Sequence, residues 1–420
     1  MNNYFFNKEY NVLSVLIFIF FISILTGPFL SDTLLILIGL FSTYYYRKSF
    51  FFYLKNNLFF FPFFGLLVCF LITSLFAQSP LTSIAYSLAY SRYVIFIYAV
   101  FAILLNHETI LNRLHKLIFL LIFFIFINIF LQDFIGQDLF GNKPIFDYRL
   151  SSFFKEELIM GKITMGLLII YLTTYYYVNK ELFNYSVIII FTLSLYIILM
   201  SGERVALFNL LLCLSIYFLL LIKNNFKKAL KLIFSLIAFL FIFLSLNEDV
   251  KNRVIFTTLD HITSPNSLKN QNSIVPFRVF NDEHEALYNV AIENFKNNPF
   301  TGSGVGSFRH FCQKYSYVHK NHCATHPHNN LFEVLSENGV FAFLLLFYIL
   351  VFSVIYFTRS LYFFFKKNDY IPNIFISLGC AGFFLPYIPS FSFHSNNHFN
   401  VIIYFSFALF IFVSHKNKLN

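Results

Sequence analysis

Charged residues are scarce in this chain. Asp, Glu, Lys and Arg make up 12% of the 420 residues, whereas soluble domains carry roughly 25%. Hydrophobic residues make up 58%, and apolar runs of about 18 or more residues, long enough to cross a bilayer, recur along the chain. The composition therefore excludes an ordinary soluble protein and predicts an all-α polytopic membrane protein.

Signals of several other protein classes are also missing. The chain has no internal repeats and no Pro- or Ser-rich linker. Its first apolar run, residues 12–30, lacks a small-residue cleavage site after it, so we expect a retained membrane span. The stretch GSGVGS at 302–307 follows no strand and has no Lys-Ser/Thr pair. Neither a dinucleotide fingerprint nor a P-loop is therefore indicated, and we expect a tight loop.

Twelve apolar segments are predicted to span the membrane. They are residues 11–30, 32–46, 58–77, 88–106, 117–132, 160–178, 185–200, 204–222, 230–247, 330–357, 371–389 and 399–414. One large polar segment separates the ninth span from the tenth, and within it the amphipathic pattern of residues 280–295 predicts a helix. The predicted domains are spans 1–9 (1–247), a loop domain (248–328) and spans 10–12 (329–420).

The basic residues predict the orientation of the spans. With a cytoplasmic N-terminus, the inner segments hold more than half of the Lys and Arg residues, but few of the Asp and Glu residues. Cytoplasmic loops carry such an excess of Lys and Arg. Both termini are therefore expected in the cytoplasm and the loop domain on the outer side. The sequence pI of about 9.2 then reflects orientation, and nucleic-acid binding is not needed to explain it.

A polar cluster, THPHNN, lies where the tenth span begins. Pro327 suits the first turn of a helix that Thr325 or His326 would cap. His328 would then begin the span, beside unpaired backbone N–H groups that favour a phosphate or diphosphate. Gly339 would lie about three turns further on the same face and let another helix approach. An imidazole there suits a general base, and the alternative is a histidine that only hydrogen-bonds the backbone.

Three arginines are candidates for binding a phosphate, because a guanidinium can grip its oxygens in a bidentate manner. Arg204, in SGERVALFNL, lies where the eighth span leaves the outer side. Arg278 opens the predicted helix of the loop domain, and Arg92 lies near the outer end of the fourth span. The alternatives are that Arg204 only snorkels to water and that Arg278 is simply solvated.

Five histidines lie between His310 and His328, with two cysteines among them. Their spacing matches no recognised Cys/His zinc pattern, so no metal site is expected. Cys312 and Cys323 both fall on the outer side, where an oxidising compartment would favour a disulfide. The other three cysteines lie in predicted spans and are expected to serve packing.

Three stretches together resemble the O-antigen ligase and polymerase family. HPHNNLFEVLSENGVFA is similar to its His-Asn-x₉-Gly signature, and SGERVALFNL to its Ser-x-x-Arg segment. PFRVF, followed by NNPFTGSGVGSF, resembles its Arg…Asn-Pro-x-x-Gly-x-Gly stretch. The resemblance runs from about Ser201 to Phe343, and the layout with one large outer loop before the tenth span agrees. Ala342 stands where the ligase pattern often has a second glycine.

The resemblance implies a GT-C-like glycosyltransferase in the bacterial inner membrane, with its active site facing the periplasm. The donor would be a glycan on undecaprenyl diphosphate. The acceptor would be lipid A–core for a ligase, or another carrier-linked repeat unit for an O-antigen, capsule or exopolysaccharide polymerase. Neither a metal nor a cofactor is expected. A lipid or polysaccharide transporter is the alternative from another class, but charged residues here sit mostly at span ends and in loops.

The resemblance also implies roles for particular residues. His328 would activate the acceptor hydroxyl as the catalytic base. Arg204 and Arg278 would hold the diphosphate, and Arg92 is a weaker candidate for the same task. The residues expected to support the site are His326, Asn329 and Gly339.

Overall fold

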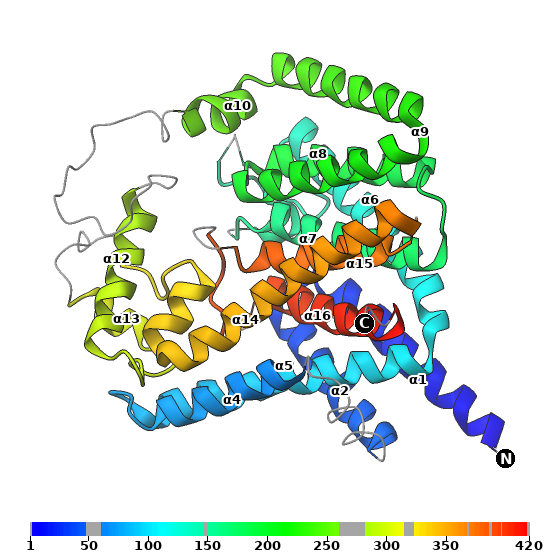
Figure 1. Ribbon diagram of the computed structural model, residues 1–420. Helices are drawn as coiled ribbons and strands as arrows, with labels where there is room; N and C mark the ends of the chain where they lie inside the picture. The colour runs from blue at the N-terminus through cyan, green and yellow to red at the C-terminus, as the bar shows by residue number, and fades with distance from the viewer. Residues whose placement is uncertain are drawn as a thin grey trace.

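The computed structural model describes residues 2–47, 60–146, 149–155, 157–259, 282–314, 323–367, 369–385, 389–395 and 397–417. Within these ranges the chain is helical and forms no β-strand. The apolar helices are α1 (Asn2–Ser23), α2 (Pro28–Tyr46), α4 (Phe61–Ser74), α5 (Pro80–Asn106), α6 (Leu111–Ile135), α7 (Met160–Val178), α8 (Tyr185–Ser201), α9 (Arg204–Leu246), α14 (Asn330–Lys367), α15 (Ile371–Phe383) and α16 (His398–Asn417). Figure 1 shows them packed as a bundle, with α12 (Asp282–Asn297) and α13 (Phe308–Cys312) at one end.

The predicted all-α class is confirmed, and each predicted span overlaps one of these helices. Six stretches of the described chain are long and apolar enough to cross a membrane: α2, α5, residues 108–135, α9, α14 and α16. Four shorter apolar helices accompany them, namely Val12–Ser23, Phe61–Ser74, Tyr185–Ser201 and Ile371–Phe383. The count of twelve crossings stays a prediction. The amphipathic helix expected at 280–295 is found as α12.

Helix α9 contains two of the predicted spans. The residues expected to connect them, 223–229, are largely helical, and the helix is interrupted at Asn225, which has φ −157° and ψ 86°. Figure 1 shows the chain turning sharply there. Lys223 donates from Nζ to the carbonyl oxygens of Phe364 (2.6 Å) and Phe365 (2.7 Å). The bend of α9 therefore lies against the C-terminal end of α14, and these contacts satisfy carbonyls that a helix end leaves unpaired.

Helix α14 is also interrupted, at Gly339, where φ is 74° and ψ is −174°. Residues 330–338 thus form a short helical segment at an angle to the long remainder. Asn329 caps this segment: its Oδ1 accepts hydrogen bonds from the N–H groups of Leu331 (3.0 Å) and Phe332 (3.2 Å). The expected cap at Thr325 or His326 is therefore wrong. His328 lies before the helix, so the expected helical face shared with Gly339 is also wrong.

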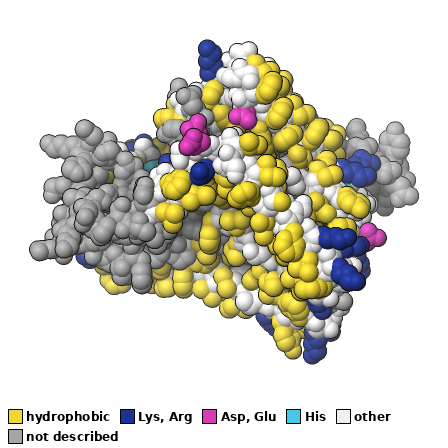
Figure 2. All heavy atoms as spheres, turned by 90° about the horizontal axis from the view of Figure 1, so that it is seen from above, with side chains coloured by type: hydrophobic (Ala, Val, Ile, Leu, Met, Phe, Trp, Pro, Cys, Tyr) yellow, Lys and Arg dark blue, Asp and Glu magenta, His cyan; other side chains and the backbone are white. Residues whose placement is uncertain are grey.

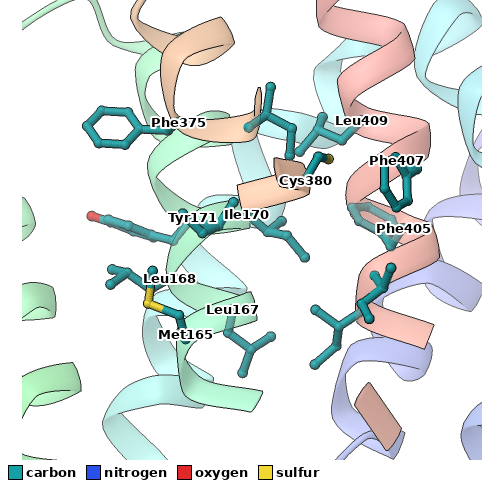
Figure 3. Packing of buried hydrophobic residues seen from close by; sticks show 14 of the residues in the cluster. Met165, Leu167, Leu168, Ile170, Tyr171, Phe375, Cys380, Phe405, Phe407 and Leu409 are labelled. Atoms are coloured by element: carbon teal, nitrogen blue, oxygen red, sulfur yellow. The ribbon is translucent and has the colours of Figure 1, made fainter. Parts of the chain in front are cut away.

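Close packing around α7 holds the centre of the bundle together. Figure 3 shows buried side chains of α7, α15 and α16, among them Ile170, Cys380 and Phe405, filling the space between these helices. Gly166 permits this approach, because a Cβ there would lie 2.6 Å from Cγ2 of Ile402. Lipid tails are as apolar as these side chains, so in a membrane such close packing, rather than escape from water, stabilises helix association.

The surface carries a pattern that matches the predicted orientation. The face seen in Figure 2 is largely apolar, and Lys and Arg side chains gather on it at the end away from α12 and α13. At that end Lys223 contacts α14, and Lys416 near the end of α16 forms an ion pair with Glu108. A basic cytoplasmic face is expected to look like this. Which face is cytoplasmic stays a prediction.

Candidate functional site

Several helix ends converge at the end of the bundle that carries α12. Helix α8 ends at Gly202, whose φ of 63° reverses the chain so that α9 begins at Arg204. The Glu203 carboxylate between them accepts a hydrogen bond from the backbone N–H of Gly161 in the first turn of α7 (2.6 Å). The backbone N–H of Ser390 donates to the carbonyl oxygen of His328 (2.7 Å). The first bond joins the starts of α7 and α9, and the second holds the segment before α14 against Ser390. Lys162 of α7 lies within electrostatic reach of His328.

Three imidazoles gather there. The ring centroids of His326 and His328 are 4.2 Å apart, and His284 of α12 lies 5.4 Å from His328. The backbone of His328 has a φ of 55°, in the left-handed region, which residues other than glycine uncommonly adopt. Such a conformation persists only where surrounding contacts enforce it. The neighbouring bonds at Asn329 and Ser390 supply that enforcement.

These imidazoles are held in their neutral form. Burial, followed by the nearby charge of Lys162, lowers the pKa of His328 to about 4. Burial, His328 and Lys162 lower the pKa of His326 to about 3. The pKa of His284 falls to about 4, mainly through burial and then through His328. At neutral pH each ring therefore carries one unprotonated nitrogen.

The cationic side chains of Lys162 and Arg204 lie within electrostatic reach of the imidazoles, and two more arginines adjoin them. Arg204 is within electrostatic reach of Arg149 and Arg253, and Lys162 within reach of Arg149 and all three histidines. Arg149 donates from Nε to the carbonyl oxygen of Ser201 (3.3 Å), which fixes it against the end of α8. Glu203, 7% exposed, supplies a carboxylate between Lys162 and Arg149. Positive charge concentrated in this way is suited to an anionic ligand.

The backbone of α14 does not supply the expected anion site. The N–H group of Asn330 donates to Ser390 Oγ (2.9 Å), and those of Leu331 and Phe332 donate to Asn329. The prediction of unpaired amides beside His328 is therefore wrong. An anion here would be bound by side-chain cations.

The predicted arginines have different surroundings. Arg204 lies in the cluster just described. Arg92 forms an ion pair with Asp32 (2.7 Å) and stacks over the ring of Tyr93, with its guanidinium carbon 4.7 Å from the ring centroid. These contacts give Arg92 a structural task, and its role in binding a diphosphate stays a prediction. Arg278 lies outside the described residues.

Two buried carboxylates of α14 accept hydrogen bonds from the loops around the site. Glu337, fully buried, accepts hydrogen bonds from the N–H groups of Gly306 (2.8 Å) and Phe308 (2.9 Å). Glu333 binds the hydroxyl of Ser392 (2.5 Å) and the N–H of Phe393 (2.6 Å). Residues 330–338, which we call the platform, thus hold two segments in place. One is the loop of residues 299–308, which we call the glycine loop, and the other is residues 392–393.

Gly339 lets the glycine loop approach this platform. A Cβ at Gly339 would lie 2.3 Å from the carbonyl oxygen of Phe300, and the N–H of Val340 donates to the carbonyl of Pro299 (2.9 Å). A Cβ at Gly302 would in turn meet the backbone of Glu337 at 2.3 Å. The prediction that Gly339 allows a close approach is therefore right in kind, but the neighbour is a loop and not another helix.

Removing the carboxylate of Glu337 should destabilise the protein. We expect Glu337→Ala to lower the free energy of unfolding by about 2–5 kcal/mol, because two buried N–H groups lose their acceptor. The measurement is thermal unfolding of the purified protein in detergent. Glu293→Ala is the matched control, since Glu293 is partly exposed and pairs with Lys296 on the surface of α12. Equal melting temperatures for the Glu337 variant and the wild type would show that these hydrogen bonds do not stabilise the protein.

One group of potential metal ligands occurs among the described residues. Side-chain atoms of Glu333, Glu337 and His394 lie within 4.8 Å of one another, and all three residues are buried. His394 Nε2 is 3.6 Å from Glu337, and burial lowers the pKa of His394 to about 3. The hydrogen bonds that both carboxylates already receive explain their presence as loop anchors.

The helices of the loop domain pack beside this platform. Tyr288 of α12 stacks on Phe332, with ring centroids 4.8 Å apart. The structure joins Cys312 and Cys323 in a disulfide, with a Cα–Cα distance of 5.5 Å. The second cysteine lies five residues before His328, so the cross-link ties the catalytic candidate's segment to α13.

Sequence reasoning missed several residues of this cluster. Lys162 lies near the start of a predicted span, and Glu333 and Glu337 lie in another. Ionisable residues within apolar spans are a recognised sign of function or of buried pairing. This sign could have identified all three residues from the sequence. Arg149 and Arg253 gave no comparable signal, because an arginine in a polar segment is ordinarily solvated.

Comparison with known proteins agrees with these features. Residues 189–347 match the family model described as O-antigen ligase, which supports the resemblance inferred from the sequence motifs. The matched range runs from α8 to the first part of α14, and so includes Arg204, His328 and Gly339. No curated protein matches the chain. The matched residues make up less than half of the chain.

Proposed function

We propose that this chain, whose residues 189–347 match the O-antigen ligase family, is a ligase-type glycosyltransferase. It would move a glycan from undecaprenyl diphosphate to a sugar hydroxyl of lipid A–core. Its site would face the periplasm from the inner membrane, with both termini in the cytoplasm. The observation that carries the proposal is the placement of neutral imidazoles near Lys162 and Arg204, with Arg149 and Arg253 within electrostatic reach of Arg204.

In this mechanism His328 acts as the general base. Its imidazole takes the proton of the acceptor hydroxyl while that oxygen bonds to the anomeric carbon of the donor sugar. The bond between that carbon and the diphosphate oxygen breaks, and its electron pair leaves with the diphosphate. The low pKa of His328 supports the role, because the free enzyme then presents the unprotonated form at neutral pH. His326, Asn329 and Gly339 hold the segment in place.

The cations stabilise the leaving group. Negative charge grows on the diphosphate as the bond breaks, and fixed positive groups lower the energy of that transition state. Arg204 lies in the cluster, and Arg278 is proposed to join it from the loop domain. No step needs a metal or another cofactor, since the side chains supply the charge.

A polymerase of the same family is the alternative function, because Ala342 replaces the second glycine of the ligase pattern. A lipopolysaccharide gel of a deletion strain separates the two. We expect the ligase mutant to lose all O-antigen from core. Core bearing a single repeat unit would instead identify a polymerase. Loss of O-antigen with the lipid-linked glycan trapped on the cytoplasmic side of the membrane would favour a transporter.

A further inference from the structure

Two acidic residues of the platform lie side by side in the protein interior. Glu333 and Glu337 are one helical turn apart on α14, and they are only 1% and 0% exposed. Like charges at this spacing repel each other, and a buried charge is costly unless a partner compensates it. Arg309 is within electrostatic reach of Glu337, but Arg309 itself is exposed. The loop hydrogen bonds orient the two carboxylates, but they do not balance two negative charges.

His394 faces this pair, and in the described part of the chain neither of its ring nitrogens has a hydrogen-bond partner. Its side chain is 4% exposed, and its Nε2 lies 3.6 Å from Oε2 of Glu337. The ring of Phe70 packs against the imidazole, with the two ring centroids 4.7 Å apart. Buried polar groups are rarely left without a partner, because the loss of their hydration is then uncompensated. His394 therefore needs a partner that the described residues do not supply.

The three side chains are close enough to share one ion. One ligand atom from each residue lies within 4.8 Å of the other two. Ligands bound to a tetrahedral zinc ion at about 2.0–2.2 Å lie roughly 3.4 Å from one another, so side-chain shifts of roughly 1 Å would close the set. A carboxylate oxygen that accepts one hydrogen bond keeps a second lone pair for a metal. The loop hydrogen bonds to Glu333 and Glu337 would then orient the ligands, as outer partners do in metal sites.

We propose that Glu333, Glu337 and His394 bind one divalent metal ion, and that this ion is zinc. An imidazole combined with carboxylates suits zinc, whereas magnesium and calcium take oxygen ligands. Zinc is also commonly bound by three protein side chains, with a water in the fourth position. The dication balances the two carboxylates and gives His394 the partner that it lacks.

The ion would join segments that surround the proposed active site. Two of its ligands belong to the platform, and Glu337 also binds the glycine loop. The third ligand, His394, follows Ser390, whose N–H donates to the carbonyl oxygen of His328. The ion therefore stabilises the framework that positions His328. Its role is structural, because no step of the proposed transfer passes through it, and the site does not depend on that function.

The first test measures zinc in purified full-length protein that carries no polyhistidine tag. Elemental mass spectrometry should find about one zinc ion per chain, and competition with a zinc chelator gives the affinity. His394→Ala should weaken that affinity by more than about a hundredfold, since losing only an outer partner of a ligand costs about 10–100-fold. His310→Ala, which removes an exposed imidazole of α13, is the matched control and should bind zinc like the wild type. Unchanged zinc binding by the His394 variant would overturn the site.

A second test separates metal binding from loop anchoring. The amide of Glu333→Gln can still accept from the N–H of Phe393 and can donate to the hydroxyl of Ser392, but one charge is gone. Without zinc, this variant should be at least as stable as the wild type, because two like charges no longer lie buried together. With zinc, the wild type should melt at a higher temperature and the variant should not respond. A zinc-free wild type whose melting temperature zinc leaves unchanged would show that the carboxylates only anchor loops, and this measurement needs no variant to fold.

Discussion

Replacing His328 with alanine should reduce glycan transfer by at least about a hundredfold, the usual contribution of a general base, while the protein stays in the membrane. The imidazole lies among the cations proposed to hold the leaving group, and its lowered pKa keeps it unprotonated. Without it, the acceptor hydroxyl loses the imidazole proposed to take its proton. The measurement is transfer by purified protein, with membrane levels checked by immunoblot.

Two further variants separate chemistry from backbone strain. His328 has a φ of 55°, which asparagine tolerates better than alanine, so His328→Asn should fold normally and still fail to transfer. His310 is an exposed imidazole on α13, and His310→Ala should transfer at the wild-type rate. Normal activity in both His328 variants would return that residue to a purely structural role.

The pKa of His328 also predicts the pH profile. Since the folded protein lowers this pKa to about 4, the base form is present at higher pH and is lost only as the pH falls through that value. The rate at low donor concentration should therefore stay flat between about pH 7.5 and 5.5, where an unperturbed imidazole would become protonated. A bound diphosphate adds negative charge near the ring, so the acid limb at saturating donor should lie at higher pH.

Arg204→Lys should reduce transfer by about tenfold to a thousandfold, comparable to the loss of one donor that stabilises a transition-state anion. A lysine keeps the charge but cannot grip two phosphate oxygens with a planar fork. The loss should appear both in the rate and in the affinity for pyrophosphate. We expect the same of Arg278→Lys if that side chain joins the cluster.

Arg359→Lys is the control for this substitution. Arg359 is exposed on α14, near the end of the bundle away from His328, and its exchange should leave transfer unchanged. An Arg204→Lys variant with a normal rate and normal pyrophosphate binding would instead show that Arg204 only carries its charge to the membrane surface.

The sequence predicted the helices well, because long apolar runs can be accommodated in a membrane only as helices. Through the resemblance, it also assigned Arg204 and His328 to one site, which stays a prediction. It did not predict the break at Gly339, since a positive φ depends on the loop that packs there. The cap at Asn329 was missed although asparagine is a strong N-cap residue, because the preceding proline suggested an earlier helix start.

The cationic cluster could not be assembled from the sequence at all. Arg149, Lys162 and Arg253 come from three different segments, and only the packing of α7, α8 and α9 brings them together. Each residue alone has an ordinary explanation, such as solvation or a helix end near water. Their combined charge is a property of the folded chain.

The bend of α9 has a consequence for how the protein is made. Lys223 donates to Phe364 and Phe365, about 140 residues later in the chain. During synthesis the ammonium group therefore emerges long before its acceptors exist. The two segments of α9 on either side of Asn225 therefore enter the membrane before these hydrogen bonds can form. The bonds form once α14 has been made. The first nine predicted spans are thus inserted before Lys223 can bind α14 and hold the bend of α9. His328 directly precedes α14, so it reaches the site only when that helix is made.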